Sequence, residues 1–171
     1  AILFSVRHMM VSKARGQFEK FDVQVNLDEA NPSNTTVLAT IDAASINTRD
    51  EQRDAHLRSA DFLTVDTYPQ LVFKSTRVEQ LPDGHGRLIG DLTIRDATRE
   101  VGLEVEYYGQ SQSPWGTTSA GFCGLTKLDR RAWGLTWNQA LETGGWLVGD
   151  QISIEIEVEL IKVPDAVAEQ A

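Results

Sequence analysis

Histidine and cysteine are the side chains of this 171-residue chain best suited to acid–base or metal chemistry. His8, His56 and His85 show neither a His-x-His nor a His-Glu-x-x-His spacing, so the sequence predicts no metal site. Cys123 is the only cysteine, which excludes an intrachain disulfide and a thiolate metal cage. No nucleophile–base set can be recognised, and the glycines of residues 84–90 have the wrong spacing for a phosphate loop. The residues therefore favour a protein that is not an enzyme.

Arginine is the second residue type that could bind a ligand. Its planar guanidinium matches a pair of phosphate oxygens, and a helix N-terminus offers further amide donors to an anion. The candidates for contacting a ligand head-group are Arg49, Arg53, His56 and Arg95. The alternative is that such arginines only lock loops by pairing with neighbouring acids, as Arg53 could with Asp50 or Asp54.

The elements that must position these residues are strands. Residues 151–162 alternate strictly, with Ile152, Ile154 and Ile156 on one face and glutamates on the other. Period-two alternation is typical of a half-buried strand. Eight such stretches predict an all-β fold, an extended eight-stranded antiparallel lipocalin-like barrel. The first and last strands cover about twelve residues each, roughly 40 Å, which favours a slender ligand.

The connectors between these strands are unequal. In an up-and-down order, residues 12–16, 47–69, 95–98 and 129–150 meet at one end, which also gathers nine of the sixteen basic residues. A capping-box pattern at residues 48–51 predicts one short helix, about 48–59, which caps this end. Short turns near Asn31, Pro82 and Ser113 and both termini fall at the other end. We call these the decorated end and the plain end, and we expect the decorated end to be the functional mouth.

The barrel interior is predicted to bind an apolar chain. Strand parity gives the cavity lining as Val6, His8, Met10, Phe21, Val23, Phe73, Leu92, Ile94 and Val105. The alternative is a dry, packed core without a ligand. His8 is the one polar side chain on this apolar face, so it would contact the ligand or be satisfied by a single buried hydrogen bond.

Two further classes of function stay open. An interior His8 with carboxylates at the rim could support general acid–base catalysis of a small molecule. Alternatively, a packed barrel could be an interaction module in which Trp115, Trp133 and Trp146 mark a partner surface, although loop tryptophans more often anchor their loops.

Charge and hydropathy limit the partners and the location. Net charge is −9, which disfavours nucleic acid and anionic membranes as partners. No apolar run of 18 residues occurs, so we expect no stable membrane insertion. We expect one domain over residues 1–162 and a tail over 163–171, with a homodimer as a possible assembly. A cytoplasmic location is favoured for the chain as given, and a periplasmic or secreted one if a signal was removed.

Several longer stretches of the chain resemble the YceI-like family. They include residues 5–12 (Ser-Val-Arg-His-Met-Met-Val-Ser), 53–62 (Arg-Asp-Ala-His-Leu-Arg-Ser-Ala-Asp-Phe) and 68–76 (Tyr-Pro-Gln-Leu-Val-Phe-Lys-Ser-Thr). Further matching stretches are 15–18, 41–48, 90–95, 133–135, 144–145 and 147–150. The chain departs from the family at its start, where the first half-strand is absent or cut, and at Asp96, where a glycine is usual. The resemblance implies a lipocalin-like barrel that carries a polyisoprenoid or a related long-chain amphiphile, with no catalysis and no cofactor other than that lipid ligand.

Overall fold

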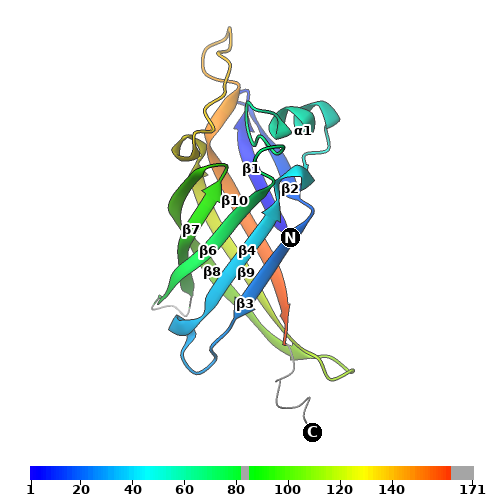
Figure 1. The fold of residues 1–171 in the computed structure, drawn as a ribbon, viewed down its shortest axis with the longest axis vertical. Helices are drawn as coiled ribbons and strands as arrows, with labels where there is room; N and C mark the ends of the chain where they lie inside the picture. Colours follow the sequence, from blue (N-terminus) through cyan, green and yellow to red (C-terminus); the bar gives the residue numbers. More distant parts are fainter. Residues whose placement is uncertain (82–84, 163–171) are drawn as a thin grey trace.

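A computed structural model describes residues 1–81 and 85–162 of the chain. It contains one antiparallel sheet of ten strands that curls around a single interior, and one α-helix, α1 (Glu51–Arg58) (Figure 1). The strands are β1 (Ile2–His8), β2 (Ser12–Phe18), β3 (Phe21–Asn26), β4 (Thr36–Asp42), β5 (Ile46–Asn47), β6 (Gln70–Gln80), β7 (Gly86–Ile94), β8 (Ala97–Gln112), β9 (Thr118–Asp129) and β10 (Val148–Ile161). Three 3₁₀ turns complete the fold: η1 (Pro32–Asn34), η2 (Ala43–Ser45) and η3 (Arg130–Trp133). The all-β, lipocalin-like class and the single helix are confirmed.

The strand count is ten rather than eight because two of the predicted elements divide differently. The connector expected over residues 12–16 lies instead at residues 9–11, and Gly16, at the end of that expected connector, stands within β2 opposite Phe4. A Cβ on Gly16 would lie 2.5 Å from Cζ of Phe4, so this glycine gives room to a ring rather than forming a turn. The stretch of residues 36–46, expected as one strand, is divided by η2 into β4 and β5.

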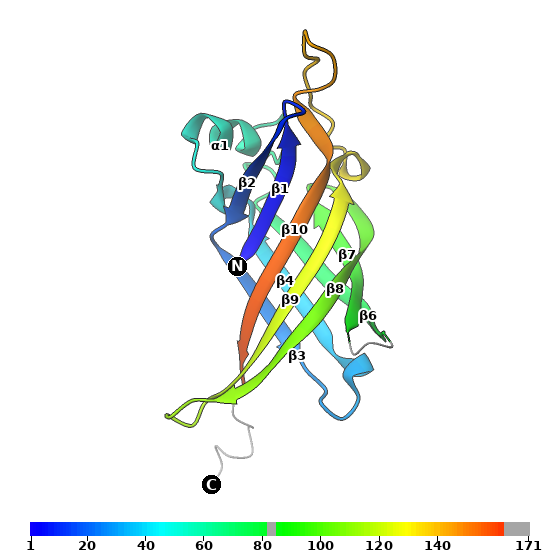
Figure 2. The same cartoon turned by 180° about the vertical axis from the view of Figure 1, so that it is seen from behind.

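The sheet order is β3-β4-β6-β7-β8-β9-β10-β1-β2-β5. Its two ends are joined through the chain, because β2 runs on into β3 and β4 runs through η2 into β5. Phe18 of β2 accordingly pairs with Ile46, and Phe21 of β3 pairs with Ile41. The wall therefore returns on itself, as the two opposite views show (Figures 1 and 2).

Connectors are divided between the two ends as expected. Figure 1 shows α1, η3 and the loop of residues 139–147 at one end, with η1 and the turn at 113–117 at the other. The N-terminus lies about halfway along the wall rather than at the predicted plain end. It is held there by the Glu157 amide, which donates to the Ala1 carbonyl at 2.9 Å. The predicted tail, residues 163–171, and part of the predicted turn near Pro82 lie outside the described residues.

The helix begins two residues later than its capping pattern indicated. Asp50 is the N-cap, since its carboxylate accepts the Arg53 amide at 3.1 Å. Thr48 is instead buried, and its amide donates to the Asp54 carboxylate at 2.8 Å. Asp54 in turn is only 7 % exposed, so the first turn of α1 is bound to the chain that precedes it.

Candidate functional site

The inward faces of the strands form a continuous apolar lining whose exposure is graded along the barrel. Near the decorated end Leu92, Ile94 and Val101 are 7–8 % exposed. Further along β8 from Val101, Val105 is half-buried and Tyr107, on the same face, is 51 % exposed. Among the described residues no large core side chain is fully buried. A packed interior of this size would contain fully buried side chains, so the residual exposure indicates that the lining is not tightly packed.

The decorated end is closed by apolar side chains from its own connectors. Trp133 is 4 % exposed, and its indole Nε1–H donates to the Leu92 carbonyl at 2.9 Å. Leu63 and Leu135 belong to the same buried cluster, at 7 % and 6 %. Apolar side chains therefore fill the end that was expected to be the functional mouth. We call Leu63, Trp133 and Leu135 the seal.

Most of the predicted lining residues face the interior. Phe73, Leu92 and Ile94 are in the buried cluster, and Val105 packs against it. Phe21, 37 % exposed, and the half-buried Val23 pair with Ile41 and Ala39 at the edge strand β3. Val6 is half-buried beside Ala14 and Ile152.

Met10 and His8 do not have the predicted places. Met10 is 49 % exposed and lies in the β1–β2 turn with a positive φ of 66°, so its assignment to the lining is wrong. The apolar alternation simply continues past the end of the strand. His8 is the last residue of β1, half-buried and paired with Ser12. Within the described part of the chain no ion pair or side-chain hydrogen bond joins its imidazole to a carboxylate.

Two of the head-group candidates, Arg53 and His56, have their polar atoms bonded to other residues of the protein. The Arg53 guanidinium donates from Nε to Thr48 Oγ1 and from Nη2 to the Thr48 carbonyl, both at 2.8 Å. His56 Nε2 lies 2.8 Å from Asp61 Oδ2, and its ring packs edge-on against Phe62 and Trp137. Both side chains therefore hold the loops of the decorated end, although the partner of the Arg53 guanidinium is Thr48 rather than the expected Asp50 or Asp54.

The other two candidates differ from each other. Arg49 is exposed and lines a cleft outside the barrel. Arg95 has Nη2 donating to the Trp133 carbonyl at 3.2 Å, whereas its Nε is buried without a hydrogen-bond partner. A buried donor without a partner is destabilising, so it is a candidate for contact with a ligand. Of the four, Arg95 alone combines contact with the seal and a buried, unpaired donor.

Arg130 is the functional residue that the sequence did not single out. It is 3 % exposed, and its guanidinium donates to the carbonyls of Gly149 (2.9 Å), Leu135 (2.6 Å) and Trp137 (2.9 Å). Burial lowers the pKa of this guanidinium, while the nearby Asp150 and Asp129 act in the opposite direction. Arg130 thereby fixes the connector that contains Trp133. Its only sequence signal is its place before a long, glycine-rich connector.

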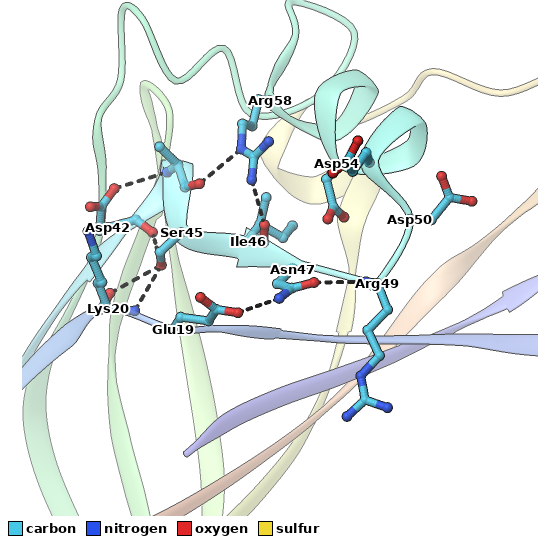
Figure 3. Close-up of a pocket in the computed structure, with 12 residues that line it drawn as sticks. Glu19, Lys20, Asp42, Ser45, Ile46, Asn47, Arg49, Asp50, Asp54 and Arg58 are labelled. Carbon is cyan, nitrogen blue, oxygen red and sulfur yellow. Dashed lines mark hydrogen bonds between the residues drawn. The ribbon is translucent and has the colours of Figure 1, made fainter.

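A cleft of about 640 Å³ lies outside the barrel, between α1 and the β2–β5 part of the wall (Figure 3). Its polar groups largely satisfy one another. Arg58 donates to the carbonyls of Ala44 and Ile46 at 2.9 Å, and the Asn47 amide donates to Glu19. Within residues 1–81 and 85–162, no group of three or more His, Cys, Asp or Glu could hold a metal ion. Nor is any helix of the described chain long and apolar enough to cross a membrane.

Comparisons with known proteins agree on one family. The family model of the YceI-like domain matches residues 1–160. A UPF0312 protein of Staphylococcus aureus strain USA300 is 38 % identical over 157 residues, which cover 91 % of this chain and 89 % of the relative. The Campylobacter jejuni YCEI protein has a similar structure, with a TM-score of 0.79, 27 % identity, and coverage of 92 % of this chain and 90 % of that one.

Two more distant structures share the fold. Burkholderia cenocepacia BcnA has a TM-score of 0.81 at 23 % identity, covering 93 % of this chain and 94 % of its own. A polyisoprenoid binding domain from Saccharophagus degradans has a TM-score of 0.62 at 10 % identity, covering 95 % and 93 %. With the family model spanning nearly all of the described residues, the chain belongs to the YceI-like family.

Proposed function

We propose that this chain is a non-catalytic carrier that holds a polyisoprenoid or a similar long-chain amphiphile inside the barrel formed by residues 1–162. The graded apolar lining, in which no large described side chain is fully buried, carries this proposal. Each methylene transferred from water to such a lining contributes about 0.8 kcal/mol, so a long chain needs no polar contact to bind tightly. The likeness to a Saccharophagus degradans domain described as polyisoprenoid binding supports the same class of ligand.

The ligand enters from the plain end in this proposal. The seal of Leu63, Trp133 and Leu135 blocks the decorated end, and exposure of the lining rises towards the plain end, at Tyr107. The Tyr107 ring packs on Phe122 with a centroid distance of 5.0 Å. These two rings would contact the chain as it enters.

The head-group contact is assigned to Arg95. Its unpaired Nε lies next to the seal, so an anionic head bound there would leave the tail directed towards the plain end. The four candidates Arg49, Arg53, His56 and Arg95 are thereby reduced to one for testing.

Extraction of the purified protein with organic solvent, followed by mass spectrometry, tests the carrier function. We expect a long-chain lipid in stoichiometric amount. A protein that yields no lipid, and that takes up none when incubated with a polyisoprenoid, would contradict the proposal and favour the packed interaction module.

A matched pair of glycine variants tests where the lipid lies. Gly124 faces inward, where its Cβ would meet only the end of Leu103 at 3.3 Å and, at 3.9 Å, the Cβ atoms of Leu103 and Ile156. Gly102 faces outward on the adjacent strand β8. We expect Gly124→Leu to fill the hollow and to abolish lipid retention without unfolding the protein, while Gly102→Leu retains the lipid. In a packed core Gly124→Leu would instead destabilise the fold by about 1–3 kcal/mol.

The rival functions receive less support. Catalysis by His8 lacks a partner carboxylate in the described chain, and turnover of any substrate lost in His8→Ala would revive it. For the interaction module, Trp133 is buried, and Trp115 and Trp146 belong to loops at opposite ends of the barrel (Figure 1). These three tryptophans therefore do not form one surface.

A further inference from the structure

The β1–β2 turn and the loop of residues 139–147 lie side by side at the decorated end, and the 139–147 loop projects beyond the turn along the long axis (Figure 1). We define the apolar tip as Met9, Met10, Val11 and Trp146, whose exposed fractions are 48 %, 49 %, 86 % and 56 %. The loops are joined, since the Met9 amide donates to the Leu147 carbonyl at 2.8 Å. Met10 also lies over Gly145, with Sδ only 3.0 Å from where a Cβ would stand. The tip is thus one surface built from both ends of the sequence.

The backbone of the tip is strained. Met9 and Met10 have φ values of 52° and 66°, in the left-handed region where glycine and asparagine are favoured. Long apolar side chains at these positions destabilise the turn and remain about half exposed. The fold itself does not require this strain, which indicates that the Met9 and Met10 side chains serve a contact with another molecule.

Cations lie directly below the tip. Arg7 and Lys13 are exposed and face each other in the β1–β2 register. Arg7 also donates to the Met10 carbonyl at 3.3 Å, which keeps its charge beside the turn. The acids of this region are the exposed Glu142, in the 139–147 loop, and the half-buried Asp150, which is paired with Arg130 and Arg131. This region therefore lacks the acidic surplus of the whole chain.

We propose that the apolar tip docks reversibly on the surface of a lipid bilayer. Methionine, valine and tryptophan would enter the interfacial layer, and Arg7 and Lys13 would lie at the level of the lipid phosphates. The shape favours a bilayer over a folded partner, because a convex protrusion enters a fluid layer without needing a complementary groove. This docking goes beyond the carrier function and does not depend on what the interior holds.

Sedimentation with phosphatidylcholine vesicles, with and without phosphatidylglycerol, tests the docking. We expect the protein to sediment with the vesicles, and more strongly when phosphatidylglycerol is present. The double variant Val11→Ser/Trp146→Ser should bind about tenfold or more weakly, since it removes two large apolar contacts. Trp115→Ser is the matched control, because Trp115 is 88 % exposed at the plain end and should not affect binding.

The variant Met9→Asn separates docking from folding. Asparagine tolerates the positive φ, so the melting temperature should rise or stay unchanged while vesicle binding falls several-fold. Three results would overturn the proposal: wild-type protein that never sediments with vesicles, equal losses from the tip variants and Trp115→Ser, or a homodimer on gel filtration that the tip variants abolish.

Discussion

The two ends of the barrel differ in how far the interior is covered, although the same strands form both. At the decorated end long connectors return apolar side chains to the strand ends, so that Trp133 and Leu135 are almost fully buried. At the plain end the described connectors are short turns that bring no such side chains, and Tyr107 on the inward face remains half exposed. The difference teaches that long loops can close a barrel as well as form its mouth. Access to the interior depends on where the loop side chains pack, not on how long the loops are.

Tryptophan at each end gives the largest expected contrast. Trp133→Ala removes a buried ring and leaves the Leu92 carbonyl without its donor, so the free energy of unfolding should fall by about 3–5 kcal/mol. Trp115→Ala, in the exposed turn of the plain end, should change the free energy of unfolding by no more than about 0.5 kcal/mol. Urea denaturation followed by circular dichroism measures both. Similar values would contradict the sealed end.

Arginine provides the second contrast. Arg130→Met leaves several buried carbonyls without donors and should reduce the free energy of unfolding by about 2–3 kcal/mol. Among the described residues, Arg77, towards the plain end of β6, makes exposed ion pairs with Glu79 and Glu100, at 3.3 and 3.7 Å. Arg77→Met should therefore lose at most about 1 kcal/mol. If Arg77→Met were the more damaging of the two, Arg130 would not be the anchor of the seal.

The variant Arg95→Gln tests which end of the barrel binds the head-group of the lipid. Losing one charge-assisted hydrogen bond should weaken retention of a lipid with an anionic head about tenfold and leave that of a neutral lipid unchanged. Competition between a polyprenol and its phosphate, read by mass spectrometry, measures this difference. Arg99→Gln, on the neighbouring exposed strand, is the control. If Arg95→Gln retained the phosphate as strongly as the wild-type protein does, the head-group would not lie at Arg95.

The smallest expected effect is the loss of stability at acid pH, which should be similar for one carboxylate at each end. Hydrogen bonds from Asn31 and Asn34 lower the pKa of Asp28 at the plain end, and Arg131 lowers that of Asp129 at the decorated end, both from an ordinary value of 3.8. A lowered pKa means that each carboxylate stabilises the fold above pH 3.8 and loses that effect as the pH falls through its folded value. Carboxyl titration by NMR should show both midpoints below 3.8. An Asp129 midpoint that stays low in Arg131→Ala would show that Arg131 is not the cause.

Alternation in the sequence was sufficient to predict the wall and much of the lining. Phe73, Leu92 and Ile94 are inside because period two fixes which face a strand residue takes. Met10 was misplaced because the same alternation continues into a turn, where φ becomes positive and the rule no longer applies. Gly16 was misplaced because the sequence does not distinguish a glycine that makes room for an aromatic ring from one that forms a turn.

The seal could not be predicted for a different reason. The sequence locates the connector that contains Trp133, but the direction of its side chain depends on Arg130 and three carbonyls that meet only after folding. The same holds for Arg53 and His56, whose partners Thr48 and Asp61 lie nearby in sequence but meet them only in the folded loops.

The pairing of the first strand with the last has a consequence for how the protein is made. Ile2 lies opposite Ile156, so nearly the whole described chain must be synthesised before this part of the wall can form. Contacts of such large sequence separation are slow to form, and we expect folding on the millisecond-to-second scale. During translation the apolar faces of β6 to β9 therefore remain uncovered until β10 leaves the ribosome. In that interval the nascent chain is open to chaperones, and any lipid present then could be enclosed as the barrel closes.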